Sequence, residues 1–347
     1  MVTNKKTINV ISLFSGCGGA DLGATGGFQF LNKSYKKHPI RIIHASDIDP
    51  KAVKTYNKNF EQKAIVSDIR MADFKGLDAD IVMGGFPCQN FSTVNPNKMP
   101  EKEENQLFWQ MSRVLNEVKP KVFIAENVKG FYMLKGGAYF EMAKKAFSDA
   151  GYDVQAHLAN ASNYGVPQLR ERLIIIGIKK EEYAEPFVFP KPTHGNKSLA
   201  KVKSLVPLKK VVSSLELTDQ RYYFSKRAVA GVKKAKQNMK RALAQDLNKP
   251  CLTITSHLAK VSLNSRDPVL LVNAKTEQYR RFTPQEAARI QSFPESFIFE
   301  GSEADAYRQI GNAVPPVLMW HVMDAVVKQF FNSDYAPIAL SLSNRYA

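Results

Sequence analysis

The chain has 347 residues with 44% hydrophobic content, which suits a globular protein with one large α/β domain and a smaller one. Its net charge of +17 indicates a polyanionic partner. The longest apolar run, residues 173–176, is too short to span a membrane, and no apolar stretch follows the first charged residues, which excludes a transmembrane anchor and a secretory signal.

Residues 8–14 are predicted to form a first buried strand, because nearly all of them are apolar. This strand runs directly into a glycine-rich turn, SGCGGADLG, which would let the backbone approach a nucleotide-like cofactor. The GxGxxG spacing is not met, since Gly16 and Gly18 fit but Asp21 occupies the third glycine position. A single glycine-rich turn is a weak signal, so the prediction depends on the strands that follow.

Two further predicted strands end in acidic residues. Residues 40–46 lead into Asp47 and Ile48, and residues 64–66 lead into Asp68. A carboxylate at such a strand end can bind the ribose hydroxyls of a cofactor, and Ile48 could cover an adenine ring. The succession of acidic strand ends therefore predicts an adenosine pocket.

A structural role is also open for these carboxylates. Asp47 or Asp49 could cap the following helix, which is predicted over residues 50–59 with a proline at its first position. The two roles are compatible, because one aspartate could bind ribose while the other caps the helix.

A rigid loop follows the next predicted strand, residues 81–83. Gly84 and Gly85 permit an unusual backbone path, and Pro87 fixes the backbone directly before Cys88. A loop that presents one thiol at the carboxyl end of a strand suggests a nucleophile, whereas the alternative is a buried structural cysteine. The chain has three cysteines and no CxxC pair, which disfavours disulfides and a zinc site and fits a reduced cytoplasmic setting.

A carboxylate follows the next strand along the chain. Helical spacing predicts a helix over residues 105–118, then a strand over 122–125 that ends in Glu126, then a helix over 138–150. If the strands before Cys88 and Glu126 are neighbours, both side chains reach one cleft, where a carboxyl group with a raised pKa could donate a proton. A cap or surface role for Glu126 is the alternative.

Two more strands are predicted over residues 152–158 and 173–178, and an extended polar segment lies between them. Alternate side chains of an extended segment project the same way. The paired arginines suit phosphate or base contacts, or else form a charged edge that discourages sheet pairing. The alternating residues are Gln168, Arg170 and Arg172.

The positive charge is concentrated in one segment, which we call the basic insert (residues 191–281). Of the 49 Lys or Arg and 32 Asp or Glu in the chain, this segment holds 20 and 5, so it carries +15 of the net +17. Such a segment is typical of a protein with a polyanionic partner, and a solvated charged surface without a partner is the alternative. Within it, residues 228–247 could form one basic helix and residues 250–256 a strand and turn.

The chain after the insert begins with a strong helix signal. Thr283 is the expected N-cap, Pro284 the first helical residue and Glu286 the third, which completes a capping box. An apolar helix is predicted over residues 317–331, and residues 332–347 are expected to be a loosely held tail.

These motifs resemble those of the DNA (cytosine-5) methyltransferase family, in the order of that family and over nearly the whole chain. Each motif alone is modest, but eight in order are specific. They are Phe14–Gly19, Asp47-Ile48-Asp49, Asp68-Ile69, Gly85-Phe86-Pro87-Cys88-Gln89, Glu126-Asn127-Val128, Gln168–Arg172, Arg281–Phe293 and Gly311-Asn312-Ala313-Val314.

The resemblance implies a Rossmann-like α/β methyltransferase fold, with a doubly wound, mostly parallel sheet and a smaller basic target-recognition domain. Residues 1–190 would form the catalytic domain that binds S-adenosylmethionine, and residues 191–280 the target-recognition domain. Residues 281–331 would return to complete the catalytic domain, and residues 332–347 would form the C-terminal tail.

The resemblance also implies a cofactor site for S-adenosylmethionine. Asp47 would hold the ribose, Ile48 and the pair Asp68-Ile69 the adenine, and Asn312 and Val314 would close the methionine side. Further lining residues would be Phe14, Gly16, Cys17, Gly19, Pro87 and Leu107.

The implied reaction is methyl transfer to C5 of a cytosine flipped out of the duplex. Cys88 would attack C6 as a thiolate, Glu126 would contact N3 and the exocyclic amine, and Arg172 with Arg170 would hold the flipped nucleotide. No metal is needed. Other substrate-binding residues would be Phe86, Gln89, Ser92, Asn127 and Gln168.

The implied partner is double-stranded DNA, bound by a monomer that could be paired with a restriction endonuclease. Base-reading candidates lie in residues 253–257. An RNA cytosine-5 methylase, a nicotinamide-dependent dehydrogenase and a non-catalytic DNA-binding module are the alternatives. The incomplete glycine pattern disfavours the dehydrogenase, and the presence of both Cys88 and Glu126 disfavours the binding module.

Overall fold

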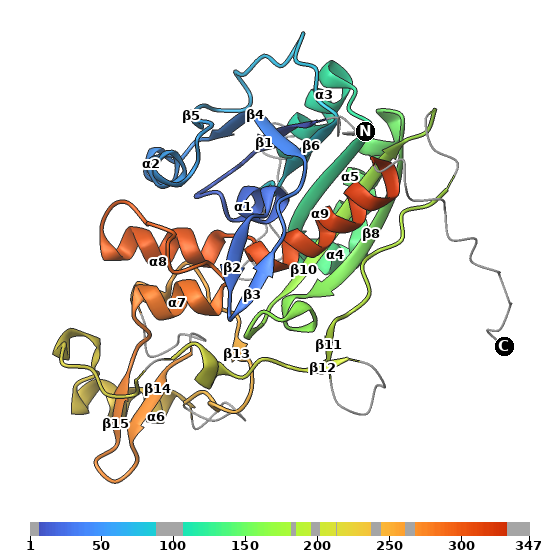
Figure 1. Cartoon of the computed structure of the whole chain (residues 1–347). Coiled ribbons are helices and arrows are strands. Elements are labelled where there is room, and N and C mark those ends of the chain that lie inside the picture. The colour runs from blue at the N-terminus through green and yellow to red at the C-terminus, as the bar shows by residue number, and fades with distance from the viewer. Residues whose placement is uncertain are drawn as a thin grey trace, which may run out of the picture.

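A computed structural model of the chain describes residues 7–87, 107–181, 185–195, 202–212, 214–236, 244–260 and 268–331. Figure 1 shows a large sheet with helices on both faces and a smaller region that hangs from one end of it. The predicted C-terminal tail lies outside the described residues.

Seven strands form the main sheet, and its mostly parallel order confirms the predicted α/β fold class. The first five strands are parallel, and β10 then pairs antiparallel with both β7 and β8. In spatial order they are β5 (Ile65–Val66), β4 (Ile40–Asp47), β1 (Ile8–Leu13), β6 (Ile81–Gly84), β7 (Val122–Val128), β10 (Glu171–Lys179) and β8 (Tyr152–Asn160).

Alternation along the central strands builds two hydrophobic cores, one on each face of the sheet. On β1, Val10 packs into one core and Ile11 into the other, because successive side chains of a strand point to opposite faces. The first core is covered by α1 (Gly19–Thr25), α2 (Pro50–Asn59) and α9 (Pro316–Phe330), and the second by α3 (Leu107–Val118) and α5 (Ala138–Asp149).

The helix starts follow the capping signals in the sequence. Asp49 caps α2 through its side chain, with Pro50 at the first position, so the capping role falls to Asp49. Thr283 and Glu286 form the predicted capping box at the start of α7 (Pro284–Ile290). A second capping box, at Ser302, starts α8 (Glu303–Asn312), a helix that the sequence analysis did not predict.

The segment Glu303–Phe330 is the one described stretch with the length and apolar composition of a membrane span. It is divided between α8 and α9, and 72% of its most apolar window is buried inside the protein. Burial of this kind is typical of helices in a protein core.

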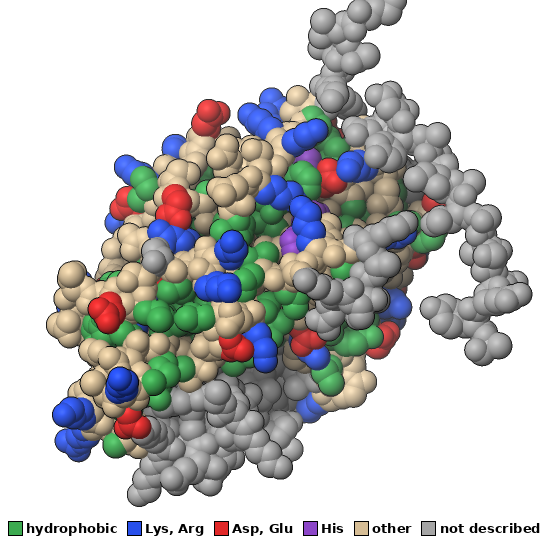
Figure 2. All heavy atoms as spheres, turned by 60° about the horizontal axis from the view of Figure 1, so that its bottom comes forward, with side chains coloured by type: hydrophobic (Ala, Val, Ile, Leu, Met, Phe, Trp, Pro, Cys, Tyr) green, Lys and Arg blue, Asp and Glu red, His purple; other side chains and the backbone are tan. Residues whose placement is uncertain are grey.

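The basic insert is built from short elements. The predicted basic helix is confirmed only as α6 (Lys226–Lys236), and it is wrong for residues 244–247, because the Gln245 amide donates to the Val269 carbonyl outside any helix. The insert strands are β11 (His194–Gly195), β12 (Lys203–Ser204), β13 (Cys251–Leu252), β14 (Leu270–Asn273) and β15 (Gln278–Arg280). Lys and Arg side chains are spread over the face of the molecule that carries it (Figure 2).

Most of the buried apolar side chains in the described part of the insert join the first core of the main sheet. Cys251, Ile254 and Leu270 belong to the same hydrophobic cluster as β1 and α9. The remaining elements are the hairpin β2 (Phe28–Phe30) and β3 (Lys33–Tyr35), α4 (Lys129–Met133), β9 (Gln168–Leu169), and 3-10 turns at Leu134–Gly137, Ala161–Tyr164, Leu208–Lys210, Gln220–Tyr222 and Leu258–Lys260.

Candidate active site

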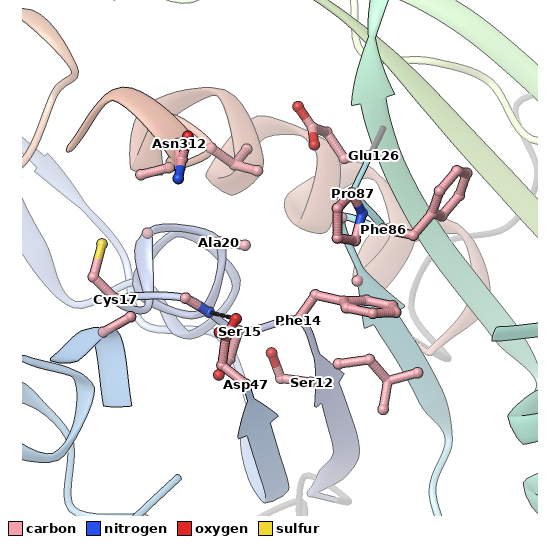
Figure 3. A pocket seen from close by; sticks show the side chains of 18 of the residues that line it. Ser12, Phe14, Ser15, Cys17, Ala20, Asp47, Phe86, Pro87, Glu126 and Asn312 are labelled. Carbon is pink, nitrogen blue, oxygen red and sulfur yellow. Dashed lines mark hydrogen bonds between the residues drawn. The ribbon is translucent and has the colours of Figure 1, made fainter. Parts of the chain in front are cut away.

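A cavity of about 750 Å³ lies at the carboxyl ends of β1, β4, β6 and β7. Phe86, Pro87 and Glu126 lie together on one side of it (Figure 3). All twelve residues expected to bind the cofactor line this cavity: Phe14, Gly16, Cys17, Gly19, Asp47, Ile48, Asp68, Ile69, Pro87, Leu107, Asn312 and Val314.

The glycine-rich turn has a backbone path that explains its composition. Phe14 and Gly16 both have positive φ, at 52° and 54°. A side chain at Gly19 would place its Cβ 2.6 Å from the Val314 carbonyl oxygen, so glycine is required where the two segments meet. The turn therefore packs directly against a segment almost 300 residues further along the chain.

Asp47 organises this turn with its carboxylate. Its two oxygens accept hydrogen bonds from the Gly16 amide and the Asp49 amide, both at 2.8 Å (Figure 3 marks the first). Burial raises the pKa of Asp47, and these amide bonds oppose the shift. The carboxylate faces the cavity with lone pairs left over, which suits the ribose contact expected for it.

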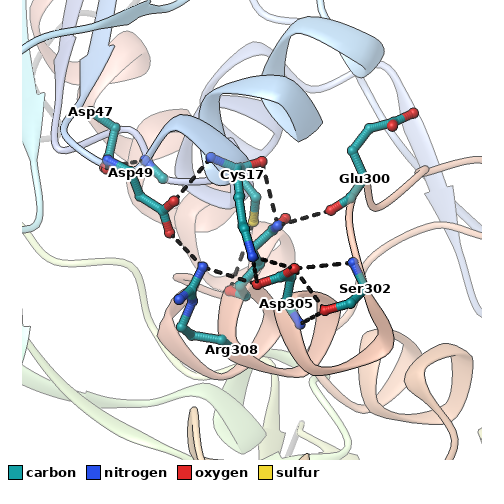
Figure 4. A network of polar contacts seen from close by, with 10 residues as sticks. Cys17, Asp47, Asp49, Glu300, Ser302, Asp305 and Arg308 are labelled. Carbon is teal, nitrogen blue, oxygen red and sulfur yellow. Dashed lines mark hydrogen bonds and ion pairs between the residues drawn. The ribbon is translucent and has the colours of Figure 1, made fainter.

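A polar network closes the cavity on the side of α8 (Figure 4). Arg308 bonds to Asp49 at 3.0 Å and to Asp305 at 3.2 Å, and Lys51 pairs with Asp305 at 2.8 Å. Arg308 also lines the cavity, and the sequence analysis did not identify it. Its position three residues before the Gly311–Val314 motif was the available signal.

Glu126 and Arg172 form a buried ion pair beside the cavity. Parallel pairing of β6 with β7 places Gly84 opposite Ala125, so the loop that leads to Cys88 starts next to Glu126. The Arg172 Nε lies 2.9 Å from the Glu126 Oε1, and the two side chains are only 12% and 13% exposed. Burial raises the pKa of Glu126, while the positive charges of Arg172 and Arg170 lower it.

The base of the Cys88 loop is fixed by a side chain from β7. The Asn127 Nδ2 donates to the Phe86 carbonyl at 3.0 Å, and both residues are buried. Both were expected to shape the substrate pocket, and both line the cavity. Cys88, Gln89 and Ser92 lie outside the described residues.

Gln168, which was expected to bind substrate, is fully buried and is not among the residues that line the cavity. Its Oε1 accepts from the Ile254 amide and its Nε2 donates to the Ile290 carbonyl and to Gln291, so its polar atoms are already bonded. Arg170 does line the cavity, but its terminal nitrogens donate to three backbone carbonyls. Only Arg172 of this motif approaches Glu126 as an ion-pair partner.

The two cysteines in the described part of the chain are poor nucleophiles. Burial raises the pKa of Cys17 to about 12, and burial also raises the pKa of Cys251. Both thiols are therefore protonated near neutral pH. No cluster of three or more metal-ligating side chains occurs among the residues that the structure describes.

A family model for C-5 cytosine-specific DNA methylases matches residues 8–328. The chain belongs to this family. It is 31% identical to the type II methyltransferase M.BspRI of Lysinibacillus sphaericus, over 94% of this chain and 82% of that protein. It is 32% identical to M.BsuRI of Bacillus subtilis, over 94% of this chain and 80% of that protein.

Solved structures of methyltransferases share the fold. The Schizosaccharomyces pombe Dnmt2 methyltransferase superposes with a TM-score of 0.70 at 20% identity, and the alignment covers 93% of this chain and 99% of that one. The protein is a DNA (cytosine-5) methyltransferase, an enzyme class that transfers its methyl group from S-adenosylmethionine. The RNA methylase, the dehydrogenase and the non-catalytic binding module are not supported.

Proposed function

We propose that Cys88 is the nucleophile of this methyltransferase and that Glu126 acts on the cytosine ring. The observation that supports this assignment is the pairing of β6 with β7, which brings the start of the Cys88 loop against the buried Glu126–Arg172 pair. Asn127 holds the Phe86 carbonyl two residues before the thiol. A loop with a fixed base can present its nucleophile in a defined place.

The cavity beside this pair is proposed to hold S-adenosylmethionine. Asp47 would bind the ribose, Ile48 with Asp68 and Ile69 the adenine, and Asn312 and Val314 the methionine part. One feature points to a polar ligand: Ser15 lines the cavity, and its buried Oγ has no hydrogen-bond partner among the described residues. When bound, S-adenosylmethionine supplies the methyl group that C5 takes.

The chain's own residues perform the remaining steps. The Cys88 thiolate adds to C6 of the flipped cytosine, and the electron pair moves towards C5 and N3. Glu126, whose pKa is raised by burial, donates a proton or hydrogen bond at N3 and so stabilises the charge on the ring. Arg172 orients Glu126 and contacts the nucleotide. After methylation, C5 loses its proton to a base or water, and the C6–sulfur bond breaks to release Cys88.

Residues 191–280, which make up all but the last residue of the basic insert, are proposed to form a target-recognition domain that selects the DNA sequence. This domain would lie between the two catalytic parts of the chain, residues 1–190 and 281–331. Most of its Lys and Arg would contact phosphates, which sets affinity without reading sequence. A smaller set of polar side chains would read base edges in the duplex.

The relatives are named type II methyltransferases. We infer from them that this enzyme works as a monomer in the cytoplasm and protects DNA against a cognate restriction endonuclease.

Bisulfite sequencing of DNA from cells that express the protein tests this function. Methylated cytosines at one short sequence are expected with the wild-type chain and not with Cys88→Ala. Unmodified DNA from wild-type cells, with the protein present and folded, would contradict the proposal.

A further inference from the structure

Arg170 joins three segments that are far apart in the sequence. Its side chain is 1% exposed, and Nη1 donates to the Ile254 carbonyl in the basic insert at 2.9 Å. Nη2 donates to the carbonyls of Gly311 and Ala313, at 2.8 and 3.0 Å. One guanidinium therefore holds the insert and the C-terminal end of α8 together.

The insert side of this junction is held by β9, which directly precedes Arg170. β13 pairs in parallel with β9, and the Thr253 Oγ1 donates to the Leu169 carbonyl at 2.6 Å. The Ile254 amide donates to the Gln168 Oε1 at 2.9 Å. Figure 1 shows β13 where the insert meets the catalytic body. The base-reading candidates, residues 253–257, thus start where the insert contacts Leu169 and Arg170.

The other side of the junction is the wall of the cofactor cavity. Gly311 and Ala313 flank Asn312, which lines the cavity. A Cβ at Gly311 would lie 2.3 Å from the backbone of Thr255 and Ser256, so the insert backbone rests directly on this wall. A shift of the insert by even a fraction of an ångström must move the wall, or the contact is lost.

We propose that Arg170 is a positioning residue that couples DNA recognition by the insert to the affinity of the cofactor cavity. DNA that orders residues 253–257 would also fix the carbonyls of Gly311 and Ala313, and with them Asn312. This coupling rests on the roles proposed above for the insert and the cavity. By linkage, bound cofactor would strengthen DNA binding by the same factor.

Arginine is required here for a geometric reason. A planar guanidinium offers donors in a fixed fork that can reach carbonyls on two sides, whereas a lysine ammonium is a point charge on a flexible stem. Arg170→Lys keeps the charge and loses the fork. We therefore expect this variant to fold and to bind both ligands with reduced communication between them.

Arg280 provides a matched control. It is also fully buried and donates to backbone carbonyls, here those of Ser214, Leu215 and Arg281, and it forms a buried ion pair with Glu286. None of these partners lines the cofactor cavity. Arg280→Lys should perturb the insert to a comparable degree without changing the coupling.

The experiment measures binding of S-adenosylhomocysteine by calorimetry, without DNA and at saturating concentration of an unmethylated duplex with the sequence found by bisulfite sequencing. In the wild type, DNA should tighten binding roughly 5- to 150-fold, the usual range of such couplings. The ratio should fall to about one in Arg170→Lys and stay at the wild-type value in Arg280→Lys. Thr253→Val, a second variant that loosens the same junction from the insert side, should give an intermediate ratio.

The results separate this inference from the proposed function. A wild type that does not bind S-adenosylhomocysteine would contradict the cofactor site itself, and the coupling with it. Binding that DNA leaves unchanged, or a ratio that survives in both Arg170→Lys and Thr253→Val, would overturn the coupling alone. If Arg280→Lys lost the coupling ratio to the same degree, the effect would come from general destabilisation of the insert, and the role of Arg170 would be wrong.

Discussion

The catalytic body and the basic insert are built differently. In the body, strands of up to nine residues and capped helices enclose two cores, and the side chains around the cavity come from strand ends. In the insert, described strands have two to four residues, and buried side chains join the core of the body. The body thus holds the side chains around the cavity in defined positions. The backbone of the insert is instead held by contacts with the body.

The way the insert is held suits a segment whose side chains differ between enzymes with different targets, as we propose for the insert. Most of the bonds that hold the insert near the cavity involve its backbone, such as the Ile254 carbonyl and amide and the β13–β9 pairing. Backbone groups are the same for nearly every residue type. Side chains of the insert can therefore change, as its proposed role in target recognition requires, while the junction is preserved.

Removal of the proposed nucleophile should cause the largest loss of activity. It should impair the reaction in the body and leave the function of the insert unchanged. Cys88→Ala is expected to abolish turnover and leave DNA binding intact, because the thiolate that adds to C6 is gone. Methyl transfer to duplex DNA and a gel-shift assay measure the two properties.

Two control variants and a mechanism-based inhibitor accompany the test of Cys88→Ala. Cys251→Ala in the insert should keep most activity, and Cys17→Ala in the body should still form the covalent bond to C6, since both thiols are buried with raised pKa values. Duplex DNA with 5-fluorocytosine at the target should give a denaturant-stable adduct with the wild type, because fluorine blocks the last proton loss. Full methylation by Cys88→Ala would end the assignment.

Exchange of the insert tests the other half of the comparison. A hybrid with residues 191–280 of a relative that has a different target should methylate the relative's sequence, with Cys88, Glu126 and Arg172 unchanged. Each good base contact should contribute about 1–3 kcal/mol of discrimination. Bisulfite sequencing identifies the new site. A hybrid that is active on the original sequence would place specificity in the body.

Glu126→Gln should lower the rate roughly 10²-fold, the usual scale for a lost acid–base group. The substitution preserves the shape of the side chain and removes its charge and its proton, so affinity for S-adenosylhomocysteine should change little. Single-turnover rates and calorimetry measure the two quantities. If the main effect were on cofactor affinity, the assigned role in ring chemistry would be wrong.

The smallest effect is expected on the pH dependence of stability, from substitution of a carboxyl group buried in the body. Asp21 accepts hydrogen bonds from Ser12 and Tyr56, both at 3.0 Å, yet burial raises its pKa from 3.8 to about 6. Because the folded-state pKa is the higher one, its stabilising contribution is present below pH 3.8 and is lost as pH rises through about 6.

Asp21→Asn does not titrate, so its stability relative to the wild type should increase between pH 4 and pH 7. The change should reach at most about 3 kcal/mol, at about 1.4 kcal/mol for each pKa unit. Urea unfolding at several pH values measures it, with Glu216→Gln, on the exposed surface of the insert, as a control that should show no comparable trend. A difference between Asp21→Asn and wild type that does not vary with pH would contradict the shift.

The sequence predicted the body well because its signals are local. Capping residues, glycine turns and apolar runs fix where helices and strands begin. The cap Thr283 was predicted correctly, and Asp49 was one of the two candidates for the cap of α2. Few such signals occur in the insert, whose short strands depend on partners elsewhere. The predicted basic helix therefore included residues 244–247, where Gln245 bonds to Val269 outside any helix.

The same distinction applies to the site. Residues at strand ends, such as Asp47 and Glu126, could be placed from topology. Gln168 and Arg170 share a spacing with Arg172, but that spacing does not reveal that their polar groups bond to Ile254 and to the segment around Asn312. Arg308 was missed for a related reason, since its partner Asp49 is 259 positions away.

The contact between Gly19 and Val314 also sets an order of events during synthesis. The 295 positions between these residues take about 15–60 s to translate at roughly 5–20 residues per second. During that time the glycine-rich turn has emerged but lacks the wall that completes the cavity. A growing or prematurely terminated chain therefore has no complete cofactor site, and modification of DNA must wait for molecules whose synthesis has passed Val314.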